Sequence, residues 1–204
     1  LSNFIIFPKT SVPLNIFEPR YLEMVNDCLK KDRIIGMIQP KFDNKKNNKP
    51  DLYSIGCAGK ITSFDETDDN RIMLVLSGVS RFKVLKEVNT EKSYRECEVN
   101  FKEFEADRVT TNNKLVFNDL KLTFNNLKSF FKKKGLVLNW EELKKQNIDQ
   151  ALNTLCMIAP FTMEEKQVLL ESKSLIDRKD RLQEIIYTYV STYNFNDIES
   201  QTIQ

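Results

Sequence analysis

The sequence predicts an α+β fold in which a β-rich part precedes a helical part. Up to about residue 101, short apolar runs are broken by turn residues, which is the pattern of β-strands. After Glu103, apolar residues recur at three- and four-residue spacing, which is typical of amphipathic helices. One helical stretch interrupts the β-rich part. We therefore expect a β-rich region over residues 1–105 with one inserted helix, followed by a helical bundle over residues 106–204.

Turn residues separate the apolar stretches of the β-rich part. Gly56 and Gly59 indicate a bulge or a close backbone approach. Both alternating sets of residues 71–76 are apolar, so we expect this strand to be buried on two faces. The acidic residues 65–70 are expected to connect a hairpin, and Gly78 to mark the next tight turn. The expected β segments are residues 4–7, 34–38, 55–61, 71–76, 80–88 and 97–101.

The inserted helix is expected to begin at Pro19. A proline suits the first helical position, because its missing N–H would have no partner there in any case. Leu22, Val25 and Leu29 follow at three- and four-residue spacing and make one apolar face. The two lysines at positions 30 and 31 stand where the helix dipole favours positive charge.

The helical part contains one long apolar stripe and several start and stop signals. The stripe ends before three lysines and Gly135, which together favour a helix end. Thr162 and Glu165 have the spacing of a capping box, which starts a helix. The stripe consists of Phe117, Leu120, Phe124, Leu127 and Phe131, and the further helices are expected over residues 139–145, 148–158 and 177–193.

Composition excludes several classes of protein. The 204 residues include 31 basic and 29 acidic side chains, so the net charge of +2 argues against a dedicated nucleic-acid binder. No apolar run approaches the ~18 residues that span a bilayer. The first seven residues have no basic leader and no cleavage site, so we expect a cytoplasmic protein rather than a secreted one.

Histidine is absent, and this excludes His-dependent nucleophiles and His-ligated zinc. The four cysteines are scattered without a C-x-x-C pair, so they indicate neither a zinc site nor a redox motif. We expect them to be reduced and mostly buried thiols. The sequence therefore predicts no metal site, no cofactor and no catalytic residue.

Four ordered motifs follow one another along the chain. The first is Val-Pro-Leu-Asn-Ile-Phe-Glu-Pro-Arg-Tyr at residues 12–21, which resembles the opening of stand-alone Lon N-terminal-domain proteins, a family with a PUA-like fold. The second, at residues 53–61, is similar to the family's G-T-x-A-x-I strand, with Cys57 where threonine is commoner. The third, at residues 76–84, is similar to its L-x-G-x-x-R-F-x-V hairpin. The fourth resembles the family's C-terminal signature and consists of residues 157–161, 165–171, Arg178 and Leu182.

The resemblance covers essentially the whole chain and implies a PUA-like pseudo-barrel followed by a helical bundle. In full Lon proteases this domain precedes an ATPase and a Ser-Lys protease domain, and it helps to recognise unfolded substrates and to assemble the ring. This sequence shows neither catalytic part. Residues 54–61 are the nearest approach to a phosphate loop, but Ser54 replaces its first glycine and Ile61 its magnesium-binding hydroxyl.

Eight residues are candidates for contact with a bound polypeptide. A polar cluster before and at the start of the inserted helix could hold peptide backbone and carboxylates, because an arginine binds a carboxylate with two hydrogen bonds. Aromatic side chains of the helical part could form an exposed apolar patch. The candidates are Phe17, Glu18, Arg20, Tyr21, Arg81, Phe130, Trp140 and Phe161.

Each candidate also has a structural interpretation. Glu18 favours the positive end of a helix, and Arg20 could pair with a neighbouring carboxylate. Arg81 could form an ion pair between strands. The aromatic residues are the side chains that contribute most area to a protein core.

Three functions follow from these observations. The first is a non-catalytic module that binds unfolded or extended polypeptides, with a separate protease or chaperone as a further partner. The alternative is an RNA-binding PUA-like protein, which would need a basic face. The third is an enzyme of unknown type, for which the sequence offers no ordered set of titratable groups.

Overall fold

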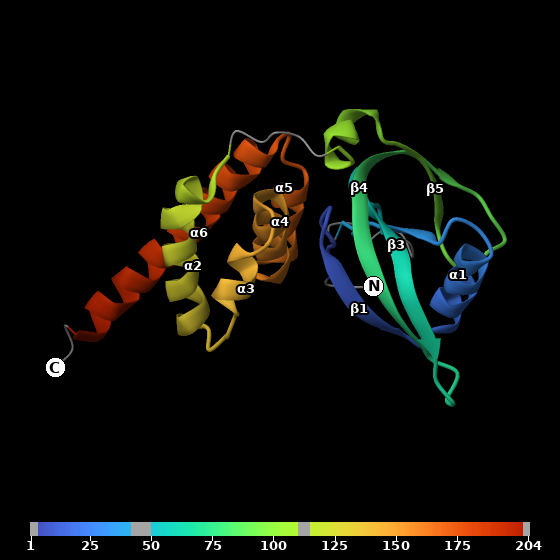
Figure 1. Ribbon diagram of the computed structural model, residues 1–204, viewed down its shortest axis with the longest axis horizontal. Helices are drawn as coiled ribbons and strands as arrows, with labels where there is room; N and C mark the ends of the chain where they lie inside the picture. The colour runs from blue at the N-terminus through green and yellow to red at the C-terminus, as the bar shows by residue number, and fades with distance from the viewer. Residues whose placement is uncertain (1–3, 42–49, 110–114, 202–204) are drawn as a thin grey trace. The chain divides into compact units, whose positions relative to one another are not determined.

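The computed structural model describes residues 4–41, 50–109 and 115–201, with side chains up to residue 191 (Figure 1). Its contacts divide the chain into two compact units, Leu1–Thr111 and Asn112–Gln204. The predicted boundary at residues 105 and 106 falls inside the short helix η1 (Lys102–Asp107). This helix stays with the first unit because Asp107 at its end is ion-paired with Arg81 of the sheet.

The first unit, called the sheet unit below, is an antiparallel five-stranded sheet with one inserted helix, which confirms the predicted α+β class. The order along the sheet is β1-β4-β3-β2, and β5 pairs with the second half of β4. The helix α1 begins at Pro19 as predicted. The elements are β1 (Ser11–Ile16), α1 (Pro19–Leu29), β2 (Ile34–Met37), β3 (Ile55–Glu66), β4 (Ile72–Val88) and β5 (Glu96–Asn100).

The prediction of a tight turn at Gly78 is wrong. β4 runs without interruption through this residue, and Figure 1 shows it beside β3 as a long curved strand. The glycine is needed for close packing instead, since a Cβ there would lie 2.0 Å from the Phe7 carbonyl oxygen. The prediction of bulges near Gly59 is confirmed, because the β3–β4 register shifts between Ala58 and Gly59.

The prediction of a β-strand at residues 4–7 is wrong. Ile5, Ile6 and Phe7 are buried and Phe4 is half-buried, but the segment forms no strand. Its chain turns at once, because the Thr10 hydroxyl donates a hydrogen bond to the Phe7 carbonyl at 2.7 Å. The Lys9 N–H then bonds to the Gly78 carbonyl at 2.8 Å, and β1 begins two residues later. This segment therefore supplies core side chains to the sheet unit without joining the sheet.

The second unit, called the helical unit below, is a bundle of α-helices with one 3₁₀ turn at its start. The capping box of Thr162 and Glu165 is present and starts α5, as predicted. The last helix is longer than the predicted residues 177–193. The elements are η2 (Phe117–Leu120), α2 (Lys121–Lys133), α3 (Trp140–Lys144), α4 (Ile148–Ile158), α5 (Met163–Leu170) and α6 (Leu175–Gln201).

The core of the helical unit is rich in aromatic rings. Phe130 stacks on Phe161 with 5.8 Å between ring centres, and Tyr189 of α6 lies 4.8 Å from Phe130. Trp140 meets Phe131 edge to face at 5.7 Å. Such ring pairs contribute ~0.5–1.5 kcal/mol beyond the area they bury, so they fix the helices against one another.

Candidate polypeptide-binding surface

One face of the sheet unit is exposed where β1, β4 and β3 lie side by side. Side chains alternate along β4, so Ile72, Leu74 and Leu76 are buried whereas Met73 is 43% exposed and Val75 is half-buried. The prediction that residues 71–76 are buried on both faces is therefore wrong. The outward row of β1 continues this face, because Pro13 pairs with Val75 and Asn15 pairs with Met73.

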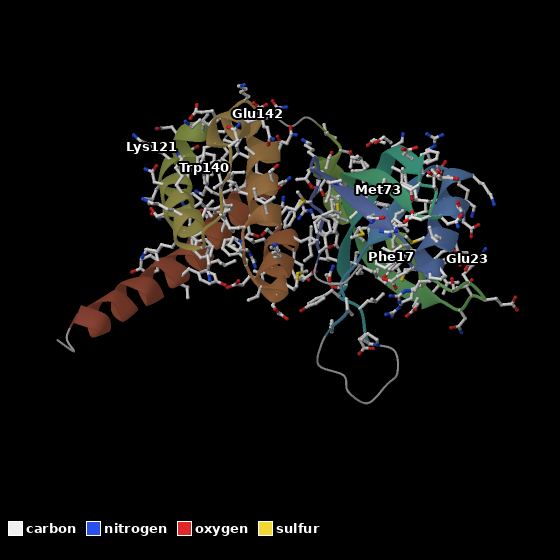
Figure 2. The ribbon with its side chains drawn as sticks, turned by 90° about the horizontal axis from the view of Figure 1, so that it is seen from below. Phe17, Glu23, Met73, Lys121, Trp140 and Glu142 are labelled. Atoms are coloured by element: carbon white, nitrogen blue, oxygen red, sulfur yellow. The ribbon has the colours of Figure 1, made fainter. Side chains whose placement is uncertain are left out.

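Phe17 extends the same face beyond the end of β1. Ile16 is the last residue of β1 and pairs with Ile72, so Phe17 is the next outward residue after Asn15. Its side chain is 63% exposed. We call Pro13, Phe17, Met73 and Val75 the Phe17–Met73 surface; Figure 2 labels Phe17 and Met73.

The polar candidates lie directly after this surface, at the start of α1. Glu18 accepts two hydrogen bonds from the Arg20 guanidinium, at 2.9 Å and 2.7 Å. The same guanidinium lies 4.5 Å from the centre of the Tyr21 ring. The hydrogen bond to Glu18 raises the pKa of Arg20, so this side chain keeps its charge. The structure thus brings four of the eight candidates together.

The Glu18–Arg20 pair is open to solvent, with the two side chains 42% and 53% exposed. Ion pairs of this kind contribute only ~0–1 kcal/mol, so another carboxylate can replace Glu18 at little cost. The pair is both a local structural contact and a group that an incoming chain can use.

Arg81 is not part of this surface. It is 4% exposed, and its guanidinium donates to both carboxylate oxygens of Asp107 at 2.8 Å. Its backbone N–H also donates to Asp107 at 2.9 Å, and its guanidinium lies over the Phe104 ring at 4.4 Å. These contacts hold η1 on β4, which is a structural role within the sheet unit.

The three aromatic candidates belong to the helical unit and are mainly core residues. Phe130 is 1% exposed and Phe161 is 7% exposed, so neither ring presents a surface to a partner. Trp140 is half-buried between Phe124, Phe131 and the ammonium of Lys128. Only the outer part of Trp140 is open to a contact.

The sequence interpretation misses Met73, Val75 and Pro13. The reason is that it assigns no strand to residues 11–16. Without this neighbouring strand, the apolar residues 71–76 are interpreted as buried on both faces. The available signal is the alternation of polar Ser11 and Asn15 with apolar neighbours in residues 11–16. This alternation is typical of a strand with one buried face.

Comparison with known proteins identifies the family. A sequence model described as the ATP-dependent protease La (LON) substrate-binding domain matches residues 1–188. The chain belongs to the Lon substrate-binding domain family. The resemblance drawn from the four motifs is therefore confirmed.

Curated relatives are Lon proteases of several bacteria. The Lon protease of Dictyoglomus thermophilum is 26% identical over 193 residues, which cover 92% of this chain and 23% of that protein. Lon protease 1 of Hydrogenovibrio crunogenus is 25% identical over 195 residues, or 93% of this chain and 23% of its own length. The chain therefore spans about a quarter of the length of the Lon proteases that it matches.

Two solved structures share the fold. The Lon N-terminal domain protein from Xanthomonas campestris has a TM-score of 0.62 at 21% identity and covers 90% of this chain and 92% of that chain. The N-terminal domain of the Lon protease from the Mycobacterium avium complex has a TM-score of 0.57 at 15% identity, with 92% and 93% covered. At these identities the likeness concerns the fold.

Metal-ligating clusters and membrane-spanning helices are both missing from the residues that the structure describes. Within the ranges 4–41, 50–109 and 115–201, no three His, Cys, Asp or Glu side chains are grouped as a metal ion requires. In these same ranges no helix has both the length and the apolar character needed to cross a membrane. All four cysteines lie there, and none forms a disulfide.

Proposed function

We propose that this Lon-family chain is a non-catalytic module that binds unfolded or extended polypeptides on its Phe17–Met73 surface. The observation that carries the proposal is the exposure of two large apolar side chains, Phe17 at 63% and Met73 at 43%, on one face of the sheet unit. Covering apolar surface releases about 25 cal/mol per Å², so a client with apolar side chains gains affinity there. The family description as a substrate-binding domain supports the same function.

In the part of the chain that the structure describes, β1 is an edge strand of the sheet, and its outer edge limits how a client can bind. The Gly78 N–H donates a hydrogen bond to the Thr10 carbonyl at 2.8 Å, which sets the pairing between β1 and β4. The N–H and C=O groups of the even-numbered residues of β1 therefore point toward β4. Those of Ser11, Pro13 and Asn15 point away from the sheet, toward its open edge. Proline has no N–H, so an added strand cannot form a complete ladder on this edge. We therefore propose that clients are held mainly through their side chains.

The adjacent Glu18–Arg20 pair adds a polar contact to the surface. A client carboxylate can take the place of Glu18 on the Arg20 guanidinium with two hydrogen bonds. In this proposal the apolar side chains supply affinity without sequence preference, and Arg20 favours clients with an acidic residue next to an apolar one.

The further elements of the proposal concern partners and location. We propose that the chain has no enzymatic activity of its own and that a separate protease or chaperone receives its clients in the cytoplasm. RNA binding is the alternative function. A filter-binding titration across salt tests it, because a phosphate-dependent complex weakens steeply as salt rises.

The main test is capture of an unfolded polypeptide, for which reduced and alkylated casein is a suitable probe. The double variant Phe17→Ser with Met73→Ser is expected to weaken capture roughly tenfold, because it removes the two large exposed apolar side chains of the surface. Binding is measured by fluorescence anisotropy of labelled casein.

Leu85→Ser is the matched control, since Leu85 is 53% exposed on the same strand β4 but is not a member of the surface. We expect this variant to bind casein as the unmodified chain does. Equal losses in the two variants would mean that general hydrophobicity, rather than the Phe17–Met73 surface, determines capture. An unchanged double variant would contradict the proposed site.

A further inference from the structure

A cavity of about 360 Å³ lies within the sheet unit, and no member of the Phe17–Met73 surface lines it. Its walls come from α1, from β2, from β5 and from the second half of β4. This volume falls in the range of ordinary ligand pockets. Apolar side chains form much of its lining, and they include Ile35, Phe82, Val84, Val99 and Phe101.

Charged side chains also line the cavity, and two of them are neutralised by neighbours. Arg95 makes two hydrogen bonds to Glu87, at 2.8 Å and 2.7 Å, and a third to the Pro50 carbonyl. Asp27 accepts hydrogen bonds from Lys92 at 2.7 Å and from the Tyr94 hydroxyl at 2.9 Å. Neither Arg95 nor Asp27 therefore contributes an uncompensated charge to the cavity.

Three charged lining groups remain, namely Asp32, Glu96 and Lys31. Two carboxylates and one ammonium leave a net charge of −1. Glu96 is half-buried, and no hydrogen bond or ion pair joins its carboxylate to any residue that the structure describes. Its oxygens are not among the buried atoms that lack a partner, so water reaches this carboxylate, and a bound cation would replace that water with a charge-assisted hydrogen bond.

Two titratable groups beside the cavity have pKa values that are raised mainly by burial and by Asp27, and Glu96 contributes least to the rise. Burial and the charge of Asp27 raise the pKa of the Cys28 thiol, and Glu96 acts in the same direction. Burial and then the hydrogen bond to Asp27 raise the pKa of Tyr94 to about 12, with a further contribution from Glu96. Both groups resist gaining a negative charge beside the cavity.

We propose that this cavity binds a basic side chain, lysine or arginine, of a polypeptide client. The aliphatic stem packs on Val84, Val99 and Ile35, and the cationic end pairs with Glu96 and Asp32. A wholly apolar occupant would leave Glu96 without a partner, and an acidic one would be repelled by both carboxylates. The inference rests on the proposed function only in naming a polypeptide as the owner of the side chain.

Two cysteines make the cavity directly measurable. Cys28 and Cys97 line it and are half-buried, whereas Cys57 and Cys156 are 1% and 0% exposed. N-ethylmaleimide is therefore expected to label Cys97 in the folded protein. The raised pKa of Cys28 lowers the fraction of its reactive thiolate, so Cys97 is the residue to follow. Cys57 and Cys156 stay unlabelled while their units remain folded.

The test compares two probes of equal shape, N-acetyl-arginine methylamide and its uncharged citrulline analogue. Labelling of Cys97 is followed by mass spectrometry of peptides at increasing probe concentration. Occupancy slows labelling by the factor 1 + [L]/Kd, so the arginine probe at twice its Kd is expected to slow it about threefold. We expect citrulline to bind roughly fivefold more weakly, because it cannot pair with a carboxylate.

Glu96→Gln keeps the shape of the side chain and removes its charge. In this variant the difference between the two probes is expected to shrink to the part that Asp32 maintains, while Glu98→Gln on the exposed part of β5 leaves the difference intact. The inference is overturned if neither probe slows the labelling of Cys97, or if both probes slow it equally in the unmodified chain. It is also overturned if the difference between the probes is unchanged in Glu96→Gln, or if Cys97 does not react with N-ethylmaleimide in the folded protein.

This experiment and the casein assay can fail separately. The small probes do not need the Phe17–Met73 surface, so the Phe17→Ser and Met73→Ser variant is expected to show the same protection of Cys97. Loss of casein binding with intact protection would contradict the proposed function alone. Intact casein binding without protection would contradict the cavity site alone.

Discussion

Two arginines of the sheet unit show that burial decides what an ion pair does. Arg81 and Asp107 are 5% and 8% exposed in their side chains, and their contacts include two side-chain hydrogen bonds of 2.8 Å. Arg20 and Glu18 make equally short contacts but are about half exposed. The first pair is part of the architecture, whereas the second can exchange partners.

We predict that Asp107→Ala destabilises the sheet unit by about 3–5 kcal/mol, because it leaves a buried guanidinium without its carboxylate. Urea unfolding measures this loss. Glu103→Ala is the matched control, since Glu103 pairs with Lys83 across the same two elements, η1 and β4, but is exposed. It is expected to cost less than about 1 kcal/mol.

Asp107→Asn gives a second measurement if the alanine variant does not fold. The amide still accepts a hydrogen bond from Arg81 but carries no charge, so an intermediate loss is expected. Equal stability of Asp107→Ala and Glu103→Ala would show that the buried ion pair contributes no more to the free energy of unfolding than the exposed one.

At the scale of elements, the long strand β4 organises the sheet unit. Its first half pairs with β1 and β3, and its second half with β3 and β5. Gly78 lies where the N-terminal segment crosses it, with the Gly78 N–H bonded to Thr10 and the Gly78 carbonyl to Lys9. The strand needs glycine at this position because the neighbouring backbone comes too close for any side chain.

We predict that Gly78→Ala destabilises the sheet unit by about 2 kcal/mol, since its Cβ would overlap the Phe7 carbonyl and push residues 4–7 out of the core. Thermal or urea unfolding measures the change. Leu85→Ala, at an exposed position on the same strand, is expected to stay within about 0.5 kcal/mol of the unmodified chain. A neutral Gly78→Ala variant would mean that this segment shifts freely.

At the scale of the whole molecule, the chain consists of two units with separate cores. The sheet unit holds the proposed surface and the cavity, while the helical unit packs its aromatic rings inward. We propose that each unit unfolds as a cooperative unit of its own. The chain offers a reporter for each, because Trp140 is its single tryptophan and lies in the helical unit, and Cys57 is buried in the sheet unit.

We predict that Thr162→Ala lowers the stability of the helical unit by about 1 kcal/mol, because it removes the cap of α5, while the sheet unit is unaffected. Trp140 fluorescence is expected to show the shift in urea, and the labelling of Cys57 is expected to show none. Gly78→Ala should give the reverse pattern. Parallel shifts of both reporters would show that the chain unfolds as one unit.

Local patterns in the sequence determined the class of fold and most helix starts. The capping box at Thr162, Pro19 at the first turn of α1 and the paired glycines of β3 act within a few residues, so they are visible without the fold. The motifs likewise placed the chain in its family. Composition alone excluded His-dependent chemistry, because the chain contains no histidine.

Only the tertiary structure decided which side chains are accessible. Met73 is exposed because the sheet buries the opposite row of β4, which consists of Ile72, Leu74 and Leu76, and Phe130 is buried because α6 brings Tyr189 against it. Arg81 is buried by Asp107, which lies 26 residues later in the chain. Burial depends on contacts between residues that are distant in the sequence, and the local spacing of residues does not predict such contacts.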